Sequence, residues 1–183
     1  MTKILAALFA LMVLASPLRA DDPLSAPANH AYLTDFANKP GATVLPSGLE
    51  FRAIKSGFGG HPTQYDWVEF SYSTKLISGK LVDSASADLP ANQQVSNLMR
   101  GLNEAIQRMQ VGDRWELAVP PELAFGAKGN TAVPPNQTLV FDITLIAVVP
   151  LQQAQSQDGS PFSVYGYNRG TEHSAGAMFT IKQ

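Results

Sequence analysis

The sequence predicts an α+β domain in which an antiparallel β-sheet wraps around one short α-helix. Between residues 49 and 145, most segments alternate in the manner of strands, and one segment has the spacing of an amphipathic helix. Strands that follow one another through hairpin-like turns, interrupted once by a helix, favour a sheet with the helix on its concave face. The 183 residues allow one such domain with an appendage at each end.

Four segments carry the strand pattern, in which the residues of one face recur at every second position: LEFRAI, VEFSYSTKLI, RWELAV and TLVFDITLI. The recurring residues are Leu49, Phe51 and Ala53; Val68, Phe70, Tyr72, Thr74 and Leu76; Trp115, Leu117 and Val119; and Leu139, Phe141, Ile143 and Leu145. This pattern is typical of antiparallel strands with one face on a core and the other in water. The Ser-Gly pair in ISGKLVD predicts a hairpin turn within the same sheet.

The one helix of the domain is predicted in GLNEAIQRM, and VGD then ends it. Four apolar residues recur there at helical spacing, namely Leu102, Ala105, Ile106 and Met109. Upstream, residues 21–44 are rich in Ala, Pro, Asp and Asn and are interpreted as a leader or linker. A short helix is expected in HAYLTDFAN, because Tyr32 and Phe36 lie four residues apart on one face.

Residues 1–20, MTKILAALFALMVLASPLRA, have the features of a cleaved secretory signal peptide. Lys3 precedes an apolar run that is too short to span a membrane, and Pro17 and Ala20 follow it. The alternative is a retained N-terminal anchor helix. Under the signal interpretation the protein is exported across the inner membrane, with the bacterial periplasm as its expected location and no membrane span after cleavage.

Residues 149–183 form a C-terminal extension with two interpretations. A Gln- and Ser-rich stretch, LQQAQSQDGSP, resembles a linker. Beyond it, FSVYGYNRG and AMFTIK hold aromatic and β-forming residues around a turn-like NRG. The extension is therefore expected to be either an extra hairpin or a disordered tail.

Composition excludes several kinds of chemistry. Without residues 1–20 the chain has 11 basic and 15 acidic residues, a balance that does not favour nucleic acid as a partner. The absence of cysteine excludes disulfides, a thiolate nucleophile and Cys-ligated metals. His30, His61 and His173 lie in separate segments, so no metal site is expected. No phosphate-binding loop or G-x-S-x-G motif occurs, and no cofactor is expected.

The most unusual stretch is PPELAFGAKGNTAVPPNQTLVF, residues 120–141, in which two Pro-Pro pairs bracket a Gly-rich loop. Prolines fix φ, so both ends of this loop are predicted to be rigid. Together with LPSGLEF, GLNEAIQRMQVGDRWELAVPPELAFGAKG and VPPNQTLVFDITLI, it makes residues 45–148 resemble the FKBP-type peptidyl-prolyl cis-trans isomerases, which bind macrolide immunosuppressants.

The upstream FANKPGATVLPSGLEF resembles the exported macrophage-infectivity-potentiator branch of that family. The long dimerising N-terminal helices of many such members are not found here, so the oligomeric state stays open. The resemblance implies an isomerase acting on Xaa-Pro bonds of proline-containing polypeptides. This activity would account for the absence of acid, base and nucleophile motifs, because rotation about an amide bond needs none of them.

The resemblance also carries the family's pocket onto nine positions of this sequence. Tyr72 and Asp83 match the family pattern, whereas Phe125 replaces a tyrosine whose hydroxyl is thought to hydrogen-bond a substrate carbonyl. The remaining positions imply contact with substrate: Val82, where the family has an aromatic residue; the apolar pair Leu98 and Met99; Leu102, where it has a tryptophan; Val133; and Phe141. The loop between Gly126 and Pro134 is one residue shorter than the common form.

These departures predict a slow isomerase with a wider, more aliphatic pocket and weak macrolide binding. Three of the residues have simpler interpretations as well: Tyr72 as a half-buried strand aromatic, Asp83 as a turn residue, and Leu102 as helix core. Two other functions also stay open. One is a non-catalytic binding module or periplasmic chaperone that holds unfolded chains in the altered pocket, and the other is a structural role in the envelope.

Overall fold

The computed structural model describes residues 23–149. The expected signal peptide and nearly all of the expected C-terminal extension lie outside these residues. The elements are α1 (Ala26–Ala37), β1 (Ala42–Val44), β2 (Glu50–Lys55), β3 (Trp67–Leu76), β4 (Leu81–Ala85), β5 (Ala91–Gln94), the 3-10 helix η1 (Val95–Asn97), α2 (Arg100–Ile106), β6 (Arg114–Val119), the 3-10 helix η2 (Pro121–Leu123) and β7 (Leu139–Val149).

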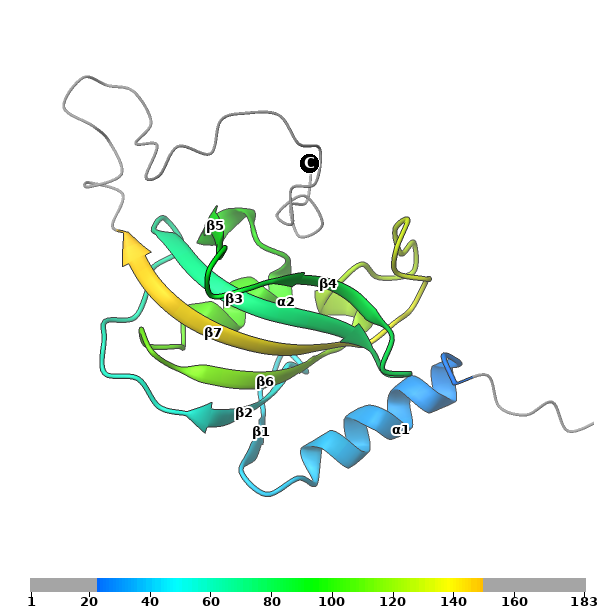
Figure 1. Ribbon diagram of the computed structural model, residues 1–183. Coiled ribbons are helices and arrows are strands. Elements are labelled where there is room, and N and C mark those ends of the chain that lie inside the picture. The colour runs from blue at the N-terminus through cyan, green and yellow to red at the C-terminus, as the bar shows by residue number, and fades with distance from the viewer. Residues whose placement is uncertain (1–22, 150–183) are drawn as a thin grey trace, which may run out of the picture.

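The strands form one antiparallel sheet in the order β1-β2-β6-β7-β3-β4, and β5 pairs with the free part of β3 (Figure 1). The predicted fold class, an antiparallel sheet with α2 against it, is confirmed. The predicted hairpin at ISGKLVD is also present, because β3 and β4 are paired. However, β2 and β3 follow each other in sequence without being neighbours, since β6 and β7 lie between them. Alternation indicates which face a residue occupies and does not indicate the neighbouring strand.

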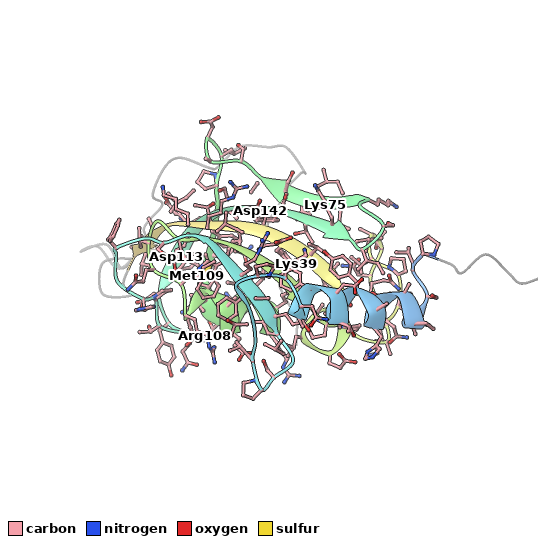
Figure 2. The ribbon with its side chains drawn as sticks, turned by 90° about the horizontal axis from the view of Figure 1, so that it is seen from below. Lys39, Lys75, Arg108, Met109, Asp113 and Asp142 are labelled. Atoms are coloured by element: carbon pink, nitrogen blue, oxygen red, sulfur yellow. The ribbon has the colours of Figure 1, made fainter. Side chains whose placement is uncertain are left out.

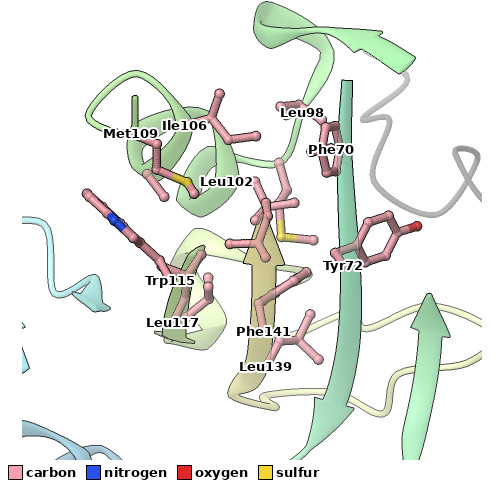
Figure 3. Packing of buried hydrophobic residues seen from close by; sticks show 14 of the residues in the cluster. Phe70, Tyr72, Leu98, Leu102, Ile106, Met109, Trp115, Leu117, Leu139 and Phe141 are labelled. Atoms are coloured by element: carbon pink, nitrogen blue, oxygen red, sulfur yellow. The ribbon is translucent and has the colours of Figure 1, made fainter. Parts of the chain in front are cut away.

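The core lies between α2 and the face of the sheet that α2 covers, which is called the inner face here (Figure 3). All residues predicted for the inner face of β3, β6 and β7 are buried. Leu102, Ala105, Ile106 and Met109 are buried too, although α2 itself ends at Ile106. Gly101 lets α2 approach β6 closely, because a Cβ atom there would overlap the side chain of Val119.

The prediction for β2 holds for only part of the strand. Leu49 is fully buried and Phe51 stacks on Trp115, with ring centroids 4.3 Å apart. Ala53, by contrast, is exposed. The register between β2 and β6 shifts between Ala53 and Lys55, so the regular alternation ends at this irregularity.

The helix α1 is longer than the predicted one and begins at Ala26, four residues before HAYLTDFAN. The hydroxyl of Ser25 accepts a hydrogen bond from the N–H of Ala28, which caps the helix, and Pro27 fits in its first turn. Phe36 is fully buried near the other end. The segment interpreted as a leader or linker thus contains a helix that packs beside β1 and β2 (Figure 1).

The opposite, outer face of the sheet carries charged residues where α1 ends (Figure 2). The ammonium of Lys39 lies 3.2 Å from one carboxylate oxygen of Glu116, and Arg52 lies 2.7 Å from the other. Glu116 follows Trp115 and precedes Leu117, both of which point to the core, so alternation directs Glu116 outward. Lys39 also lies 4.5 Å from the ring centroid of Phe36.

Candidate active site

The structure brings the nine predicted site residues into one region. Six belong to the buried cluster of the core: Tyr72, Leu98, Met99, Leu102, Val133 and Phe141. Val82 and Phe125 are partly buried and pack against this cluster. Asp83 is joined to it through Tyr72. The nine residues come from β3, β4, the approach to α2, α2 itself, the loop after η2, and β7, so the fold and not the local sequence assembles them.

A β-bulge places Val82 and Asp83 beside Tyr72. Thr74 pairs with Asp83 and Lys75 pairs with Leu81, which leaves Val82 as the extra residue of β4. Because of this extra residue, two consecutive side chains are directed to the site: Val82 packs on the core and Asp83 bonds to Tyr72. Without the bulge, strict alternation would direct one of them to the outer face.

The Tyr72 hydroxyl donates a hydrogen bond of 2.7 Å to Oδ2 of Asp83. The other carboxylate oxygen, Oδ1, accepts a bond of 2.8 Å from the backbone N–H of Ser84. Figure 3 shows the Tyr72 hydroxyl pointing away from Phe141, on the side of β3 where β4 lies. Burial raises the pKa of Tyr72 above its ordinary value, and the hydrogen bond and the charge of Asp83 raise it further. Tyr72 is therefore a neutral donor, and Asp83 is held at a fixed orientation.

An apolar wall lies between α2 and β7. Leu98 and Met99 precede α2, and Leu102 lies on its first turn (Figure 3). Leu102, Met99 and Phe141 have no exposed surface in this structure. They pack against one another and their neighbours as part of the core, and none of these three side chains carries a hydrogen-bonding group.

The rim loop, residues 124–138, holds Phe125 and Val133 through its own hydrogen bonds. The side-chain oxygen of Asn130 accepts bonds from the N–H groups of Ala132 and Val133, at 2.9 and 2.8 Å. The N–H of Gly129 donates to the carbonyl of Phe125 at 3.2 Å. Gly129 has φ +62°, and a Cβ atom there would overlap the backbone of Val133 and Pro134. Glycine is therefore required at this position.

The two ends of the rim loop meet. The N–H of Asn136 donates to the carbonyl of Gly126 at 2.9 Å, and the N–H of Gly126 donates to the carbonyl of Pro121 at 2.8 Å. The prediction of a loop held at both ends agrees with these bonds. Sequence reasoning missed Asn130, although an Asn three residues before Val133 is a common signal for a turn stabilised by its side chain. It also missed Asn29, which contacts the loop from α1 and has no local signal.

Within residues 23–149, no three His, Asp or Glu side chains lie close enough together to hold a metal ion.

One buried hydroxyl group lies near the site. The hydroxyl oxygen of Thr74 is fully buried and has no hydrogen-bond partner in the structure. Thr74 pairs with Asp83 on one side and with Phe141 on the other, so this hydroxyl lies within the apolar wall and not at its edge.

Known proteins resemble this chain in both sequence and structure. Residues 59–146 match the family described as FKBP-type peptidyl-prolyl cis-trans isomerase. The outer membrane protein MIP of Legionella longbeachae is 42% identical over 120 residues, which are 64% of this chain and 52% of that protein. The peptidyl-prolyl cis-trans isomerase Mip of Coxiella burnetii is 38% identical over 126 residues, covering 68% of this chain and 55% of that one. The chain thus spans about half the length of these curated relatives.

Among solved structures, a peptidyl-prolyl cis-trans isomerase from Pseudomonas syringae pv. tomato superposes with a TM-score of 0.64 and 31% identity. The match covers 67% of this chain and 92% of that one. The fold, the assembled site and these matches show that the chain belongs to the family of FKBP-type peptidyl-prolyl cis-trans isomerases. Within that family it belongs to the branch of the Mip-like proteins.

Proposed function

We propose that this protein is a peptidyl-prolyl cis-trans isomerase that acts slowly on Xaa-Pro bonds of exported polypeptides. The observation that carries the proposal is the Tyr72–Asp83 pair, with its 2.7 Å hydrogen bond, beside an apolar wall that includes Leu102 and Phe141. Such a site has one fixed polar partner and otherwise excludes water. It matches the requirements of amide rotation better than those of any reaction that transfers a group.

The physical problem is the barrier to rotation of about 20 kcal/mol, which comes from amide resonance. Twisting the bond removes this resonance and reduces the charge separation between nitrogen and oxygen. Water stabilises the planar, polar amide, so a dry pocket that accepts the proline ring lowers the relative free energy of the twisted state. In our proposal Leu102, Val133 and Phe141 contact the ring once the side chains that cover them in this structure move aside. Asp83, held by Tyr72, offers acceptor oxygens at the edge to an N–H of the substrate.

Reduced activity follows from the substitutions at Val82, Leu102 and Phe125. A missing hydroxyl at Phe125 removes one neutral hydrogen bond, worth about 0.5–1.5 kcal/mol, or about threefold to tenfold in rate. Leucine in place of an indole, and valine in place of an aromatic ring, remove some tens of Å² of apolar contact at about 25 cal/mol per Å². Their combined loss of about 1–2 kcal/mol would weaken the binding of proline rings and of macrolides.

We further propose that the protein works outside the cytoplasm, most simply in the bacterial periplasm. The support comes from residues 1–20, with their basic start, short apolar run and small residue at Ala20. One of the relatives is described as an outer membrane protein. Within residues 23–149, no helix has both the length and the apolar character needed to cross a bilayer.

The test is the rate of cis-to-trans isomerisation in short Xaa-Pro peptides, measured with the chain that lacks residues 1–20 and with two variants. Asp83→Ala removes the acceptor at the edge of the site and is expected to lower kcat/KM at least tenfold. Phe125→Tyr restores a hydroxyl and is expected to raise it about threefold to tenfold. Opposite changes in the two variants would be hard to explain by altered stability alone.

A matched control is Ser84→Ala, next to Asp83 on the same strand. Ser84 is exposed and bonds to Asp83 only through its backbone N–H, which this substitution keeps. Its rate should equal that of the unaltered chain. If all of these proteins are folded and none accelerates isomerisation, the proposal is wrong. Binding of unfolded chains without turnover would then favour the non-catalytic binding module.

A further inference from the structure

The helix α1 is joined to the rim loop through one buried side chain, Asn29. Only 4% of Asn29 is exposed. Its side-chain oxygen accepts a hydrogen bond of 2.7 Å from the backbone N–H of Thr138. Its side-chain nitrogen donates to the carbonyls of Leu24 and Ser25, at 3.2 and 3.0 Å, and to the side-chain oxygen of Gln137 at 3.3 Å. One amide group thus connects the start of α1 with the base of the loop.

Gln137 completes these contacts from the side of the loop. It is 5% exposed, and its side-chain nitrogen donates to the carbonyls of Leu24 and Pro135, both at 3.0 Å. Thr138 has no exposed surface. Because the contacts of Asn29 and Gln137 are buried, water cannot replace a lost partner without rearrangement, and each lost bond would leave a polar group unpaired. The contacts therefore hold the loop base more firmly than the same bonds would in solvent.

The loop base leads directly to the two rim side chains. Asn136, next to Gln137, donates its N–H to the carbonyl of Gly126, and Gly126 follows Phe125. In the middle of the loop, the side-chain oxygen of Asn130 accepts bonds from the N–H groups of Ala132 and Val133 and so fixes Val133. In Figure 1 the start of α1 lies on the same side of the molecule as this loop, before β7 begins. The buried hydrogen bonds of Asn29 thus hold Gln137 and Thr138, and the neighbouring Asn136, which is exposed, ties this end of the loop to Gly126.

We propose that Asn29 is a positioning residue for the isomerase site: by holding the N–H of Thr138 and the side chain of Gln137, it sets the position of Phe125 and Val133. This inference rests on the proposed function. It assigns a role in the site to a segment that the sequence presents as a linker. The helix α1 is then part of the working domain, and its first turn affects how closely the rim contacts a proline ring.

The experiment compares Asn29→Ala with Lys39→Ala in the whole protein. Asn29 lies in the first turn of α1, whereas Lys39 lies just beyond its other end, where it contacts Glu116 and Phe36 and not the loop. Three quantities are measured: kcat/KM on an Xaa-Pro peptide, the thermal midpoint, and hydrogen exchange of the amides of Gly126, Asn136 and Thr138. Asn29→Ala is expected to lower kcat/KM about fivefold to tenfold and to speed exchange at all three amides. Lys39→Ala should do neither.

A second comparison tests whether Asn29 acts through the rim. In the Val133→Ala background, one rim side chain that Asn29 is proposed to position is already missing. Asn29→Ala should therefore lower kcat/KM by a clearly smaller factor there than in the unaltered protein, although its effect on the thermal midpoint should be the same in both backgrounds. A further variant, Asn29→Asp, keeps an oxygen for the N–H of Thr138 and should recover part of the rate.

The inference is wrong if Asn29→Ala keeps kcat/KM within twofold of the unaltered protein. It is also wrong if the loss of rate is no larger than in Lys39→Ala at an equal shift of the thermal midpoint, because Asn29 would then contribute only to stability. A protein that shows no isomerase activity at all would refute the proposed function separately. In that case the exchange of the three amides still decides whether Asn29 holds the rim loop.

Discussion

The inner and outer faces of the sheet come from the same strands and differ in almost every physical property. On β7, Phe141 points inward and has no exposed surface, whereas 43% of the side chain of its neighbour Asp142 is exposed. The inner face packs on α2 and carries the candidate site. The outer face carries ion pairs, such as Arg114 with Asp142 at 2.6 Å.

This difference teaches where chemistry can take place in the fold. The outer face has more charge, yet its ion pairs are at least partly exposed, so water weakens their effect on anything that binds. On the inner face the carboxylate of Asp83 lies at the edge of the site, and its position is fixed by Tyr72 and Ser84. A catalyst of amide rotation needs a dry surface and little charge, and for that purpose the less polar face is the more suitable one.

The largest effect on stability is expected for a pair of neighbouring residues on β7 that lie on opposite faces of the sheet. Phe141→Ala removes a fully buried ring from the inner face and should lower the free energy of unfolding by about 3–5 kcal/mol. Asp142→Ala removes an exposed ion pair one residue away and should change it by no more than about 0.5 kcal/mol. Unfolding in urea, with folding monitored by circular dichroism, measures both. Similar losses in the two variants would contradict the division into a dry and a wet face.

Sequence patterns predicted the inner face well because both of its causes are local. Alternation assigned the inner-face residues of β3, β6 and β7, all of which are buried, and the spacing in GLNEAIQRM assigned the buried face of the helical segment. The prediction was wrong at Ala53, where the register shifts, and for the neighbours of β2. Both depend on pairing with β6, which is more than 60 residues away in the chain, and period-two patterns hold no information on such pairing.

The candidate site likewise has a part that the sequence predicts and a part that it does not. The nine positions came from resemblance to a family, and the structure brings them together, while their roles stay predictions. Asn29 could not be found from the sequence, since its partners Gln137 and Thr138 are 108 and 109 residues away. The bulge at Val82 could not be predicted from the sequence either. A bulge results from the register of two strands, and nothing in LVDSA indicates which residue will be the extra one.

A smaller effect is expected from the one polar atom within the apolar wall. Thr74→Val replaces a buried hydroxyl that has no hydrogen-bond partner with a methyl group of similar shape. This change should raise the free energy of unfolding by about 0.5–1.5 kcal/mol, because the unfolded chain can hydrate the hydroxyl and the folded chain cannot pair it. The measurement is again urea unfolding, with Ser73→Ala on the outer side of the same strand as a control. A loss of stability in Thr74→Val would mean that the hydroxyl has a partner in solution.

The smallest effect tests the outer face at its least typical residue. Glu50 is 6% exposed, one of its carboxylate oxygens has no hydrogen-bond partner, and burial raises its pKa above the ordinary value of 4.5. The folded chain therefore keeps this proton at pH values where the unfolded chain has lost it. The stabilisation that Glu50 gives is present below pH 4.5 and falls as the pH rises through the raised pKa of the folded state.

Glu50→Gln, which is neutral at every pH, should remove this slope and raise the thermal midpoint at pH 7 by about 1–3 °C, with little change at pH 4. Parallel curves for the two proteins between pH 4 and 7 would contradict this prediction and would show that Glu50 is hydrated in the folded state.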